Sequence, residues 1–346
     1  MRNYTCWSDL KAWRAHRAHG SADKMPPPFQ RELKFCCTLI LFLLVMSAVT
    51  RALGTLERNK NHQQFERTVA ADPRAVVSAC VVSGNLTVRG WDRNEVRARV
   101  TDAFQVDLTR IDQGKTQSAT ELALTGKGSR HTRSASCPPV GNVELDVPRG
   151  ATVKLQSTNG AISVSDVARV DSNSQAGSTE VIKAHGETSL STIGGEISVR
   201  DSTGSFKLHT VGGSIDARDL RPANPADAFD ADTIGGEITL NRIQHARLKV
   251  NTVSGEVDYT GPVLRGGEYS FQSISGHLRL SLPPNSSFRV SGTLGRAGGF
   301  TNDFAPKDTL NGSNRGPTRQ LNQTVGRGDA SIVLSFFSGS IQIKKR

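Results

Sequence analysis

Aromatic side chains and cysteine are scarce in this 346-residue sequence. Phe, Trp and Tyr together make up 5% of the residues and there are 5 cysteines, whereas glycine occurs 33 times. A chain so poor in aromatic residues has few of the large side chains that fill a thick globular core. Its glycine content is instead typical of many short strands and turns. The composition therefore favours an all-β fold.

A concentrated basic region is also missing, although the formal net charge is +11. Eight of the 43 Lys and Arg residues and three of the 32 Asp and Glu residues precede residue 55, which leaves 35 against 29 and a net charge of +6. These charges are spread singly along the chain. They do not form the basic stripe with interleaved aromatic residues that nucleic-acid binding requires. We therefore expect no nucleic-acid partner.

Only one long apolar run is present, and it lies near the N-terminus. The fifteen residues from Phe35 to Val49, FCCTLILFLLVMSAV, carry no charge, and Arg31 and Lys34 precede them. A membrane-spanning helix needs about 20 apolar residues, whereas the core of a cleavable signal peptide has this shorter length. We therefore predict that residues 1–54 are an export leader.

Two properties of this leader stay open at the level of the sequence. An uncleaved signal anchor or a buried core helix would also fit the apolar run, and only an uncleaved leader would attach the protein to a membrane. The leader is long, which makes Met25 an alternative start of translation. We expect the remainder of the chain to be exported, to the periplasm or the cell surface.

The cysteines are distributed as expected for an exported chain. Three of the 5 fall in the leader, at positions 6, 36 and 37, and leave Cys80 and Cys137 as a pair in the remainder. An even number of cysteines is typical of disulfide-bonded exported proteins, and we predict a disulfide between these two. Two separate buried thiols are the alternative, because sequence spacing alone does not bring the two Cβ atoms together.

A repeated pattern along the chain predicts the fold. Two alternating apolar residues, a Ser or Thr, a glycine and two more alternating apolar residues recur about every 17 to 23 residues. One copy runs from Phe206 through Thr210 and Gly213 to Ala217. The glycines of the repeat are Gly160, Gly195, Gly213, Gly236, Gly255, Gly276 and Gly339. Glycine at such a corner permits either a positive φ or the close approach of two backbones.

The alternation indicates two short strands per repeat, each with one apolar and one polar face. A single repeat cannot bury its apolar face, but consecutive repeats stacked about 4.8 Å apart bury it against one another. The Ser or Thr before each glycine is expected to bond to its counterpart in the next coil. A sandwich of hairpins is the alternative, although Asn-Gly turns occur only at 159–160 and 311–312. We therefore predict a β-solenoid.

The solenoid is predicted to span residues 76–346, after a linker at 55–75. Two polar segments interrupt it, at 104–142 and 301–328, and both are rich in Gly, Ser, Thr, Asn and charged residues. Such segments are typical of loops, so we expect two loop insertions there.

Three parts of the sequence resemble a known family. They are the segment VSGNLTVRGWDRNEVRARV from Val82 to Val100, the serial ST-x-GG-E-I-x-V units, and the closing SFFSGSIQIKKR. Together they are similar to a bacterial β-strand-repeat family of unknown function whose members are described as candidate adhesins. The resemblance covers roughly residues 65–346. It implies a single-stranded right-handed parallel β-helix in the cell envelope, with no catalytic residues to carry over.

Two outward columns of carboxylates are the candidate binding residues. Glu196, Glu237 and Glu256 share one repeat position, and Asp216 and Asp258 lie two residues beyond it. Such a column is compatible with a binding ladder, with the acid and base of a carbohydrate-active β-helix enzyme, or with a solvated face. The sequence has no nucleophile elbow, phosphate-binding glycine loop or converging set of metal ligands. We therefore expect a non-catalytic protein without a cofactor or metal.

A second row is apolar but out of phase with the buried positions. It consists of Ile193, Val211, Ile234, Val253 and Ile274, each two residues before a repeat glycine. Either the corner turns these side chains inward, or they form an exposed ladder that a partner covers.

These observations favour an exported envelope protein that binds an unidentified polymer or protein as an adhesin or scaffold. Its equally spaced contacts would sum to a useful avidity without a deep pocket. A carbohydrate-active enzyme and a membrane-anchored sensor of envelope stress are the alternatives.

Overall fold

The computed structural model describes residues 65–101, 106–112, 117–126, 137, 141–295, 298–305 and 318–346. Every regular element in these ranges is a β-strand, and no helix among them is long and apolar enough to cross a membrane. The predicted leader, 1–54, lies outside the described residues. The first strand, β1 (Phe65–Ser83), begins within the segment predicted as a linker.

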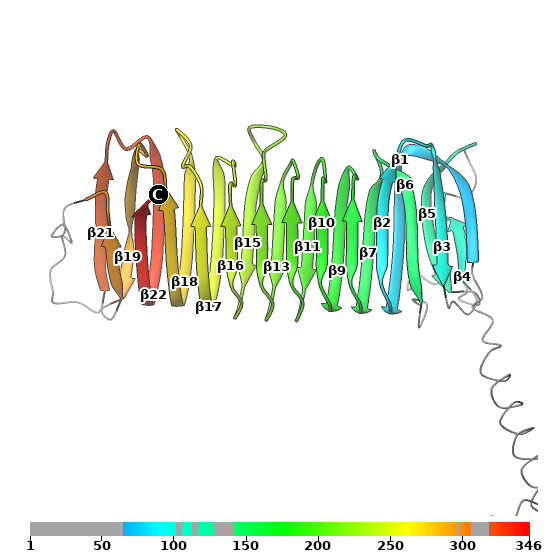
Figure 1. Cartoon of the computed structure of the whole chain (residues 1–346), viewed down its shortest axis with the longest axis horizontal. Coiled ribbons are helices and arrows are strands. Elements are labelled where there is room, and N and C mark those ends of the chain that lie inside the picture. The colour runs from blue at the N-terminus through cyan, green and yellow to red at the C-terminus, as the bar shows by residue number, and fades with distance from the viewer. Residues whose placement is uncertain are drawn as a thin grey trace, which may run out of the picture. The chain divides into compact units, whose positions relative to one another are not determined.

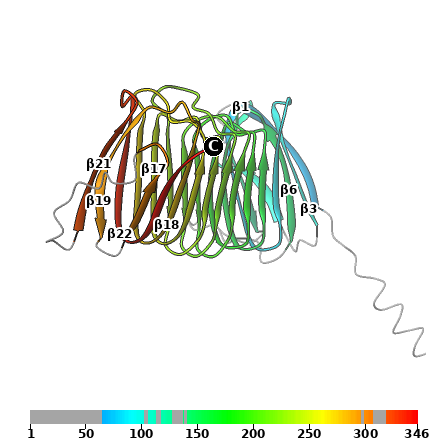
Figure 2. The same ribbon diagram turned by 60° about the vertical axis from the view of Figure 1, so that its left-hand side comes forward.

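The strands wind around one apolar core in two faces, with one strand of each coil on each face (Figures 1 and 2). The first face contains β7 (Thr152–Asn159), β9 (Arg169–Ala176), β11 (Thr188–Thr192), β13 (Phe206–Thr210) and β15 (Ala228–Thr233). The second contains β8 (Ile162–Ser165), β10 (Thr179–Ile182), β12 (Ile197–Arg200), β14 (Ile215–Arg218) and β16 (Ile238–Asn241). The strands β17 (Arg247–Thr260), β18 (Glu268–Leu282) and β22 (Ala330–Lys345) cross the corner and belong to both faces. Every one of these coils pairs in parallel with the next.

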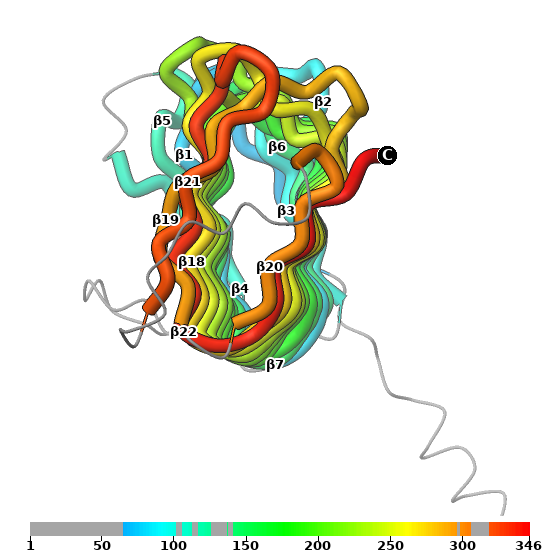
Figure 3. Tube along the Cα trace, turned by 90° about the vertical axis from the view of Figure 1, so that its left-hand side faces the viewer, coloured from blue at the N-terminus to red at the C-terminus, as the bar shows by residue number. Residues whose placement is uncertain are grey.

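The register brings identical repeat positions together. Leu208 pairs with Ala231, Ala231 with Val250, and Val250 with Phe271, and all four side chains are buried. Viewed along the stack, the coils superpose closely behind one another (Figure 3). Because each coil alone would expose its apolar face, this in-register stacking creates the core. The predicted all-β solenoid is confirmed in this respect.

The repeat glycines form a column at one corner of the coils. A Cβ atom on any of them would overlap the carbonyl oxygen of the glycine in the neighbouring coil, as Gly213 would with Gly195 and Gly236 with Gly213. Only some of them, including Gly160 and Gly339, have a positive φ. The common requirement at this corner is therefore the close approach of two backbones.

Threonine hydroxyls secure the same corner from inside. The Oγ1 atoms of Thr210 and Thr233 accept hydrogen bonds from the amides of Gly213 and Gly236, each at 3.1 Å, within their own coil. Thr210 also donates to the carbonyl oxygen of Gly195 in the neighbouring coil, at 3.4 Å. The expected chain of hydroxyl-to-hydroxyl bonds is therefore wrong, because Thr210 donates to a backbone carbonyl instead, and the buried hydroxyls of Thr252 and Ser273 have no hydrogen-bond partner among the described residues.

The N-terminal end does not stack in sequence order. β1 and β2 (Leu86–Trp91) pair directly with β7 and β8, while β5 (Ala119–Gly126) and β6 (Asn142–Pro148) pair with the other side of β1 and β2. β3 (Glu95–Thr101) lies antiparallel to β6, and β4 (Val106–Arg110) antiparallel to β5. The first coil of the chain is thus enclosed by later ones.

The C-terminal end is arranged in the same way. β22 lies between β18 and β19 (Phe288–Gly295) and pairs in parallel with both, and also with β20 (Gly299–Asn302). β21 (Thr318–Val325) then lies antiparallel to β19. The prediction that segments 104–142 and 301–328 are loops is therefore wrong in part, since they contain all of β4, β5 and β21. These strands pair at the two ends of the stack, where no further repeat follows.

The predicted disulfide between Cys80 and Cys137 is present, with the two Cα atoms 5.1 Å apart. It joins β1 to Cys137, 57 residues further along the sequence. In the entropic account such a link lowers the conformational freedom of the unfolded chain.

The two adjacent glycines of one corner provide a matched test of the glycine column. A Cβ atom at Gly236 would overlap the carbonyl of Gly213, whereas nothing lies within 4 Å of one at Gly235. We expect Gly236→Ala to lower the free energy of unfolding by about 1–3 kcal/mol through overpacking. Gly235→Ala should change it by less than about 0.5 kcal/mol. Urea unfolding measures both values, and equal effects of the two variants would contradict the close-approach explanation.

The buried His245 predicts a pH-dependent stability. Its ring packs edge-on against Phe206, with centroids 5.5 Å apart, and its Nε2 lies 2.7 Å from the carbonyl oxygen of Gly204. Burial lowers the pKa of His245 below its usual 6.5, although the Gly204 carbonyl and the charge of Asp227 oppose this shift. The unfolded chain then binds more protons than the folded chain below about pH 6.5, so stability falls as the pH decreases.

The measurement is the urea midpoint at pH 7.5 and pH 5. His245→Gln should be less stable than the wild type at pH 7.5 but should lose less stability on acidification. His209→Gln, which changes an exposed histidine, should lose as much as the wild type. An unchanged loss in His245→Gln would assign the pH dependence to other groups.

Candidate binding surfaces of the solenoid

An exposed apolar row follows the glycine corner. Its side chains are 36% to 70% exposed, and its members are Ile193, Val211, Ile234, Val253, Ile274 and Phe337. We call this row the apolar ladder. Of the two arrangements considered for the out-of-phase residues, the exposed one is correct. Phe337 joins them because Ser273 pairs with Phe336 and Ser275 with Ser338, which places Phe337 beside Ile274.

Backbone pairing explains why the corner does not turn these side chains inward. The amide of Val211 donates to the carbonyl of Thr192 at 3.2 Å, and the amide of Gly212 donates to that of Ile193 at 2.9 Å. Parallel pairing thus continues through the corner, so the inward and outward alternation of the strand continues as well. With Thr210 buried, Val211 must point outward.

The predicted carboxylates lie next to the apolar ladder, at the start of the second face. Glu256 aligns with His277, and Asp258 with Arg279. The register also places Glu237 beside Glu256 and pairs Asp258 with Thr239. Both predicted columns therefore exist, but polar and basic residues interrupt them.

Arginines neutralise much of this acidic surface. Nη1 of Arg279 lies 3.0 Å from Asp258 and 3.3 Å from Glu256, and Nε of Arg218 lies 2.8 Å from Asp216. Burial raises the pKa of Asp258, and Glu256 adds to the shift while Arg279 opposes it. Among the described residues, no three His, Cys, Asp or Glu side chains gather in a way that could hold a metal ion.

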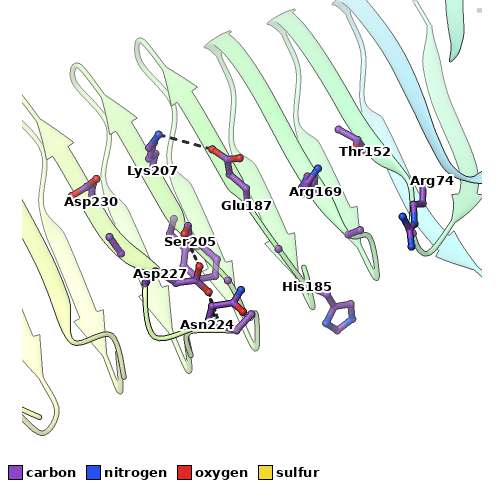
Figure 4. A pocket seen from close by; sticks show the side chains of 18 residues that line it. Arg74, Thr152, Arg169, His185, Glu187, Ser205, Lys207, Asn224, Asp227 and Asp230 are labelled. Atoms are coloured by element: carbon purple, nitrogen blue, oxygen red, sulfur yellow. Dashed lines mark hydrogen bonds and ion pairs between the residues drawn. The ribbon is translucent and has the colours of Figure 1, made fainter. Parts of the chain in front are cut away.

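A polar groove of about 760 Å³ lies at the other end of the first-face strands (Figure 4). It runs across consecutive coils from Arg74 and Arg169 to the loop at 221–228, which lengthens one corner. The small residues Ala168, Gly186 and Gly204 line it. Their spacing of 18 residues is visible in the sequence, but it predicts a groove only once a neighbouring loop is known to form a wall.

These features define an all-β solenoid whose surface is organised in columns of equivalent residues. The chain belongs to the Toastrack DUF4097 family, whose model matches residues 83–344. The resemblance noted in the sequence is therefore confirmed. No curated protein matches this sequence.

Three solved structures show similarity to this chain at low sequence identity. A candidate cell adhesion protein from Clostridium sporogenes is 11% identical, with 82% of this chain and 100% of that chain covered and a TM-score of 0.27. A candidate adhesin from Bacteroides fragilis is 11% identical, with 82% and 97% covered and a TM-score of 0.40. A candidate adhesin from Parabacteroides merdae is 12% identical, with 82% and 98% covered and a TM-score of 0.38.

Proposed function

We propose that this protein is an exported, non-catalytic scaffold of the cell envelope, in the periplasm or at the cell surface, that binds an external macromolecule through the apolar ladder. In this proposal residues 1–54 are the export leader and the coils wind in a right-handed sense. The observation that supports it is the exposure of six apolar side chains in one row. Soluble proteins rarely expose such continuous apolar surface unless a partner covers it.

The dimensions of the apolar ladder indicate how it would bind. Six residues separated by five coil steps of about 4.8 Å span about 24 Å. Full burial of an aliphatic side chain contributes about 1.5–3 kcal/mol, and these side chains are already partly buried, so each has about 1 kcal/mol left to gain. Association itself costs roughly 4–15 kcal/mol. The ladder alone therefore supports weak binding, and useful affinity requires several contacts or several copies acting together.

The charges beside the apolar ladder indicate which charge a partner would carry. Glu196 and Glu237 are exposed next to it and have no ion-pair partner among the described residues, and Glu237 accepts only a hydrogen bond from Thr239 at 3.1 Å. A partner with an apolar row flanked by cationic groups would complement this surface. The shared pairing of Glu256 and Asp258 with Arg279 supports binding over hydrolysis, because a guanidinium already holds both carboxylates.

Substitution of the ladder tests this function. Beads coated with the full chain would be incubated with fluorescently labelled peptidoglycan sacculi and outer-membrane vesicles, and their retention measured. The triple variant Val211→Thr, Ile234→Thr, Val253→Thr removes apolar surface but keeps the β-branched shape. We expect it to reduce retention at least tenfold while circular dichroism stays unchanged.

Val333→Thr is the matched control, since Val333 is also an exposed valine on the first face but is not part of the ladder. It should retain the envelope material as the wild type does. Equal retention by the triple variant and the wild type would contradict a role for the ladder, and so would absence of retention by the wild type.

A further inference from the structure

The polar groove lies at the opposite end of the first-face strands from the apolar ladder, and its wall is built from fixed parts. The carboxylate of Asp227 accepts the amides of Ala223 and Asn224, each at 2.7 Å, and the hydroxyl of Ser205 at 3.1 Å. Burial alone would raise the pKa of Asp227, but these three donors outweigh it and the pKa is lowered. The backbone of Arg221 is also paired with that of the coil before it. The 221–228 loop therefore presents a preformed wall.

Charges are separated along the groove, as Figure 4 shows. Arg74 and Arg169 lie at the end far from the loop, and neither side chain has a hydrogen bond or ion pair with another described residue. In the middle, Lys207 faces Glu187 with Nζ and Oε1 3.9 Å apart. Near the loop, Asp230 has no such partner among the described residues. Apart from the exposed His185 in the middle, the free groups are thus two cations at one end and an anion at the other.

This distribution indicates the charge pattern of a ligand. The register places Arg169 on the coil that follows Thr152, and β1 lies on the other side of Thr152. Arg74 lies two residues before the β1 residue that pairs with Thr152, so the two arginines are about 10 Å apart across the coils and offset by about 7 Å along the strands. Two long arginine side chains can still reach one carboxylate held between them. A polyanion with a charge on every unit would meet Glu187 and Asp230 further along. The ligand therefore carries its acid groups sparsely.

The chemistry of the lining separates a glycan from a peptide. Backbone groups at the groove are already used between coils, as in the bonds from Thr203 to Ala184 and from Gly204 to Arg221. An extended peptide would therefore find no free strand edge to pair with. Side chains offer instead hydroxyl acceptors at Asp230 and a donor at Lys207, which suit sugar hydroxyls. Of the rings in the lining, Phe206 is fully buried and the imidazole of His185 is exposed, so the groove has no Trp, Tyr or Phe platform for stacking a sugar.

We propose that this groove binds an acidic oligosaccharide that lies along the solenoid axis. A carboxylate-bearing sugar is held by Arg74 and Arg169, and neutral sugars extend over Glu187 and Lys207 to Asp230 and the 221–228 loop. This site is separate from the apolar ladder, so either proposal can fail without the other.

Calorimetric titration of the full chain with defined hexasaccharides tests the proposal. The first probe is a chain of N-acetylglucosamine units that ends in one glucuronate, and the second, chitohexaose, has no carboxylate. We expect saturable binding of the first probe, weakened by salt, and at least tenfold weaker binding of the second. Arg74→Gln and Arg169→Gln should each weaken binding of the acidic probe at least tenfold. Asp230→Asn should weaken the binding of the acidic probe and of chitohexaose by similar factors.

Arg289→Gln is the matched control, because Arg289 is an exposed first-face arginine outside the groove, and it should bind as the wild type does. All four substituted side chains are exposed or partly exposed, and circular dichroism would verify that each variant is folded. Absence of saturable binding of the acidic probe would overturn the proposal. The proposal would also be overturned if the wild type bound chitohexaose or polyglutamate as tightly as the acidic probe. It would be overturned as well if the two arginine variants bound the acidic probe as tightly as the wild type does.

Discussion

Hydrogen bonding between successive coils at strand spacing is the constraint on which the rest of the structure depends. Parallel pairing places each residue directly over its counterpart one coil away, and the glycine column allows this pairing to continue through a corner that any Cβ atom would obstruct. Each position of the repeat therefore becomes a column. Inward columns form the core, whereas outward columns form the surfaces that contact other molecules.

Much of this arrangement was predictable from local sequence patterns. The alternation of apolar residues and the regular spacing of the glycines already indicate which repeat positions pair between coils. Leu208, Ala231, Val250 and Phe271 form one column as predicted. The order of coils at the two ends was not predictable. A repeat pattern specifies which positions pair but not which copies are neighbours, and the strand at 119–126 lies in a segment whose polar flanks are typical of a loop.

The three surfaces were predictable to different degrees, because the repeat specifies which positions align but not the contacts that each side chain makes. The carboxylate columns follow directly from the repeat, but Arg279 lies on the next coil, and its pairing with Glu256 and Asp258 depends on side-chain geometry. Exposure of the apolar ladder depends on backbone bonds at the corner, which alternation alone does not determine. The groove required a wall that a single unusual insertion supplies, so periodicity could not indicate it.

Cysteine cross-linking tests the order and register of the coils most directly. Gln272 pairs with Ser335, and Ser335 in turn pairs with Thr293, because the C-terminal strand lies between the two earlier coils. Under mild oxidation, Gln272→Cys with Ser335→Cys should form a disulfide, since paired residues lie within the usual Cα separation. Gln272→Cys with Thr293→Cys should not, because the two residues are two coils apart. A disulfide in the second variant and none in the first would contradict the stacking described above.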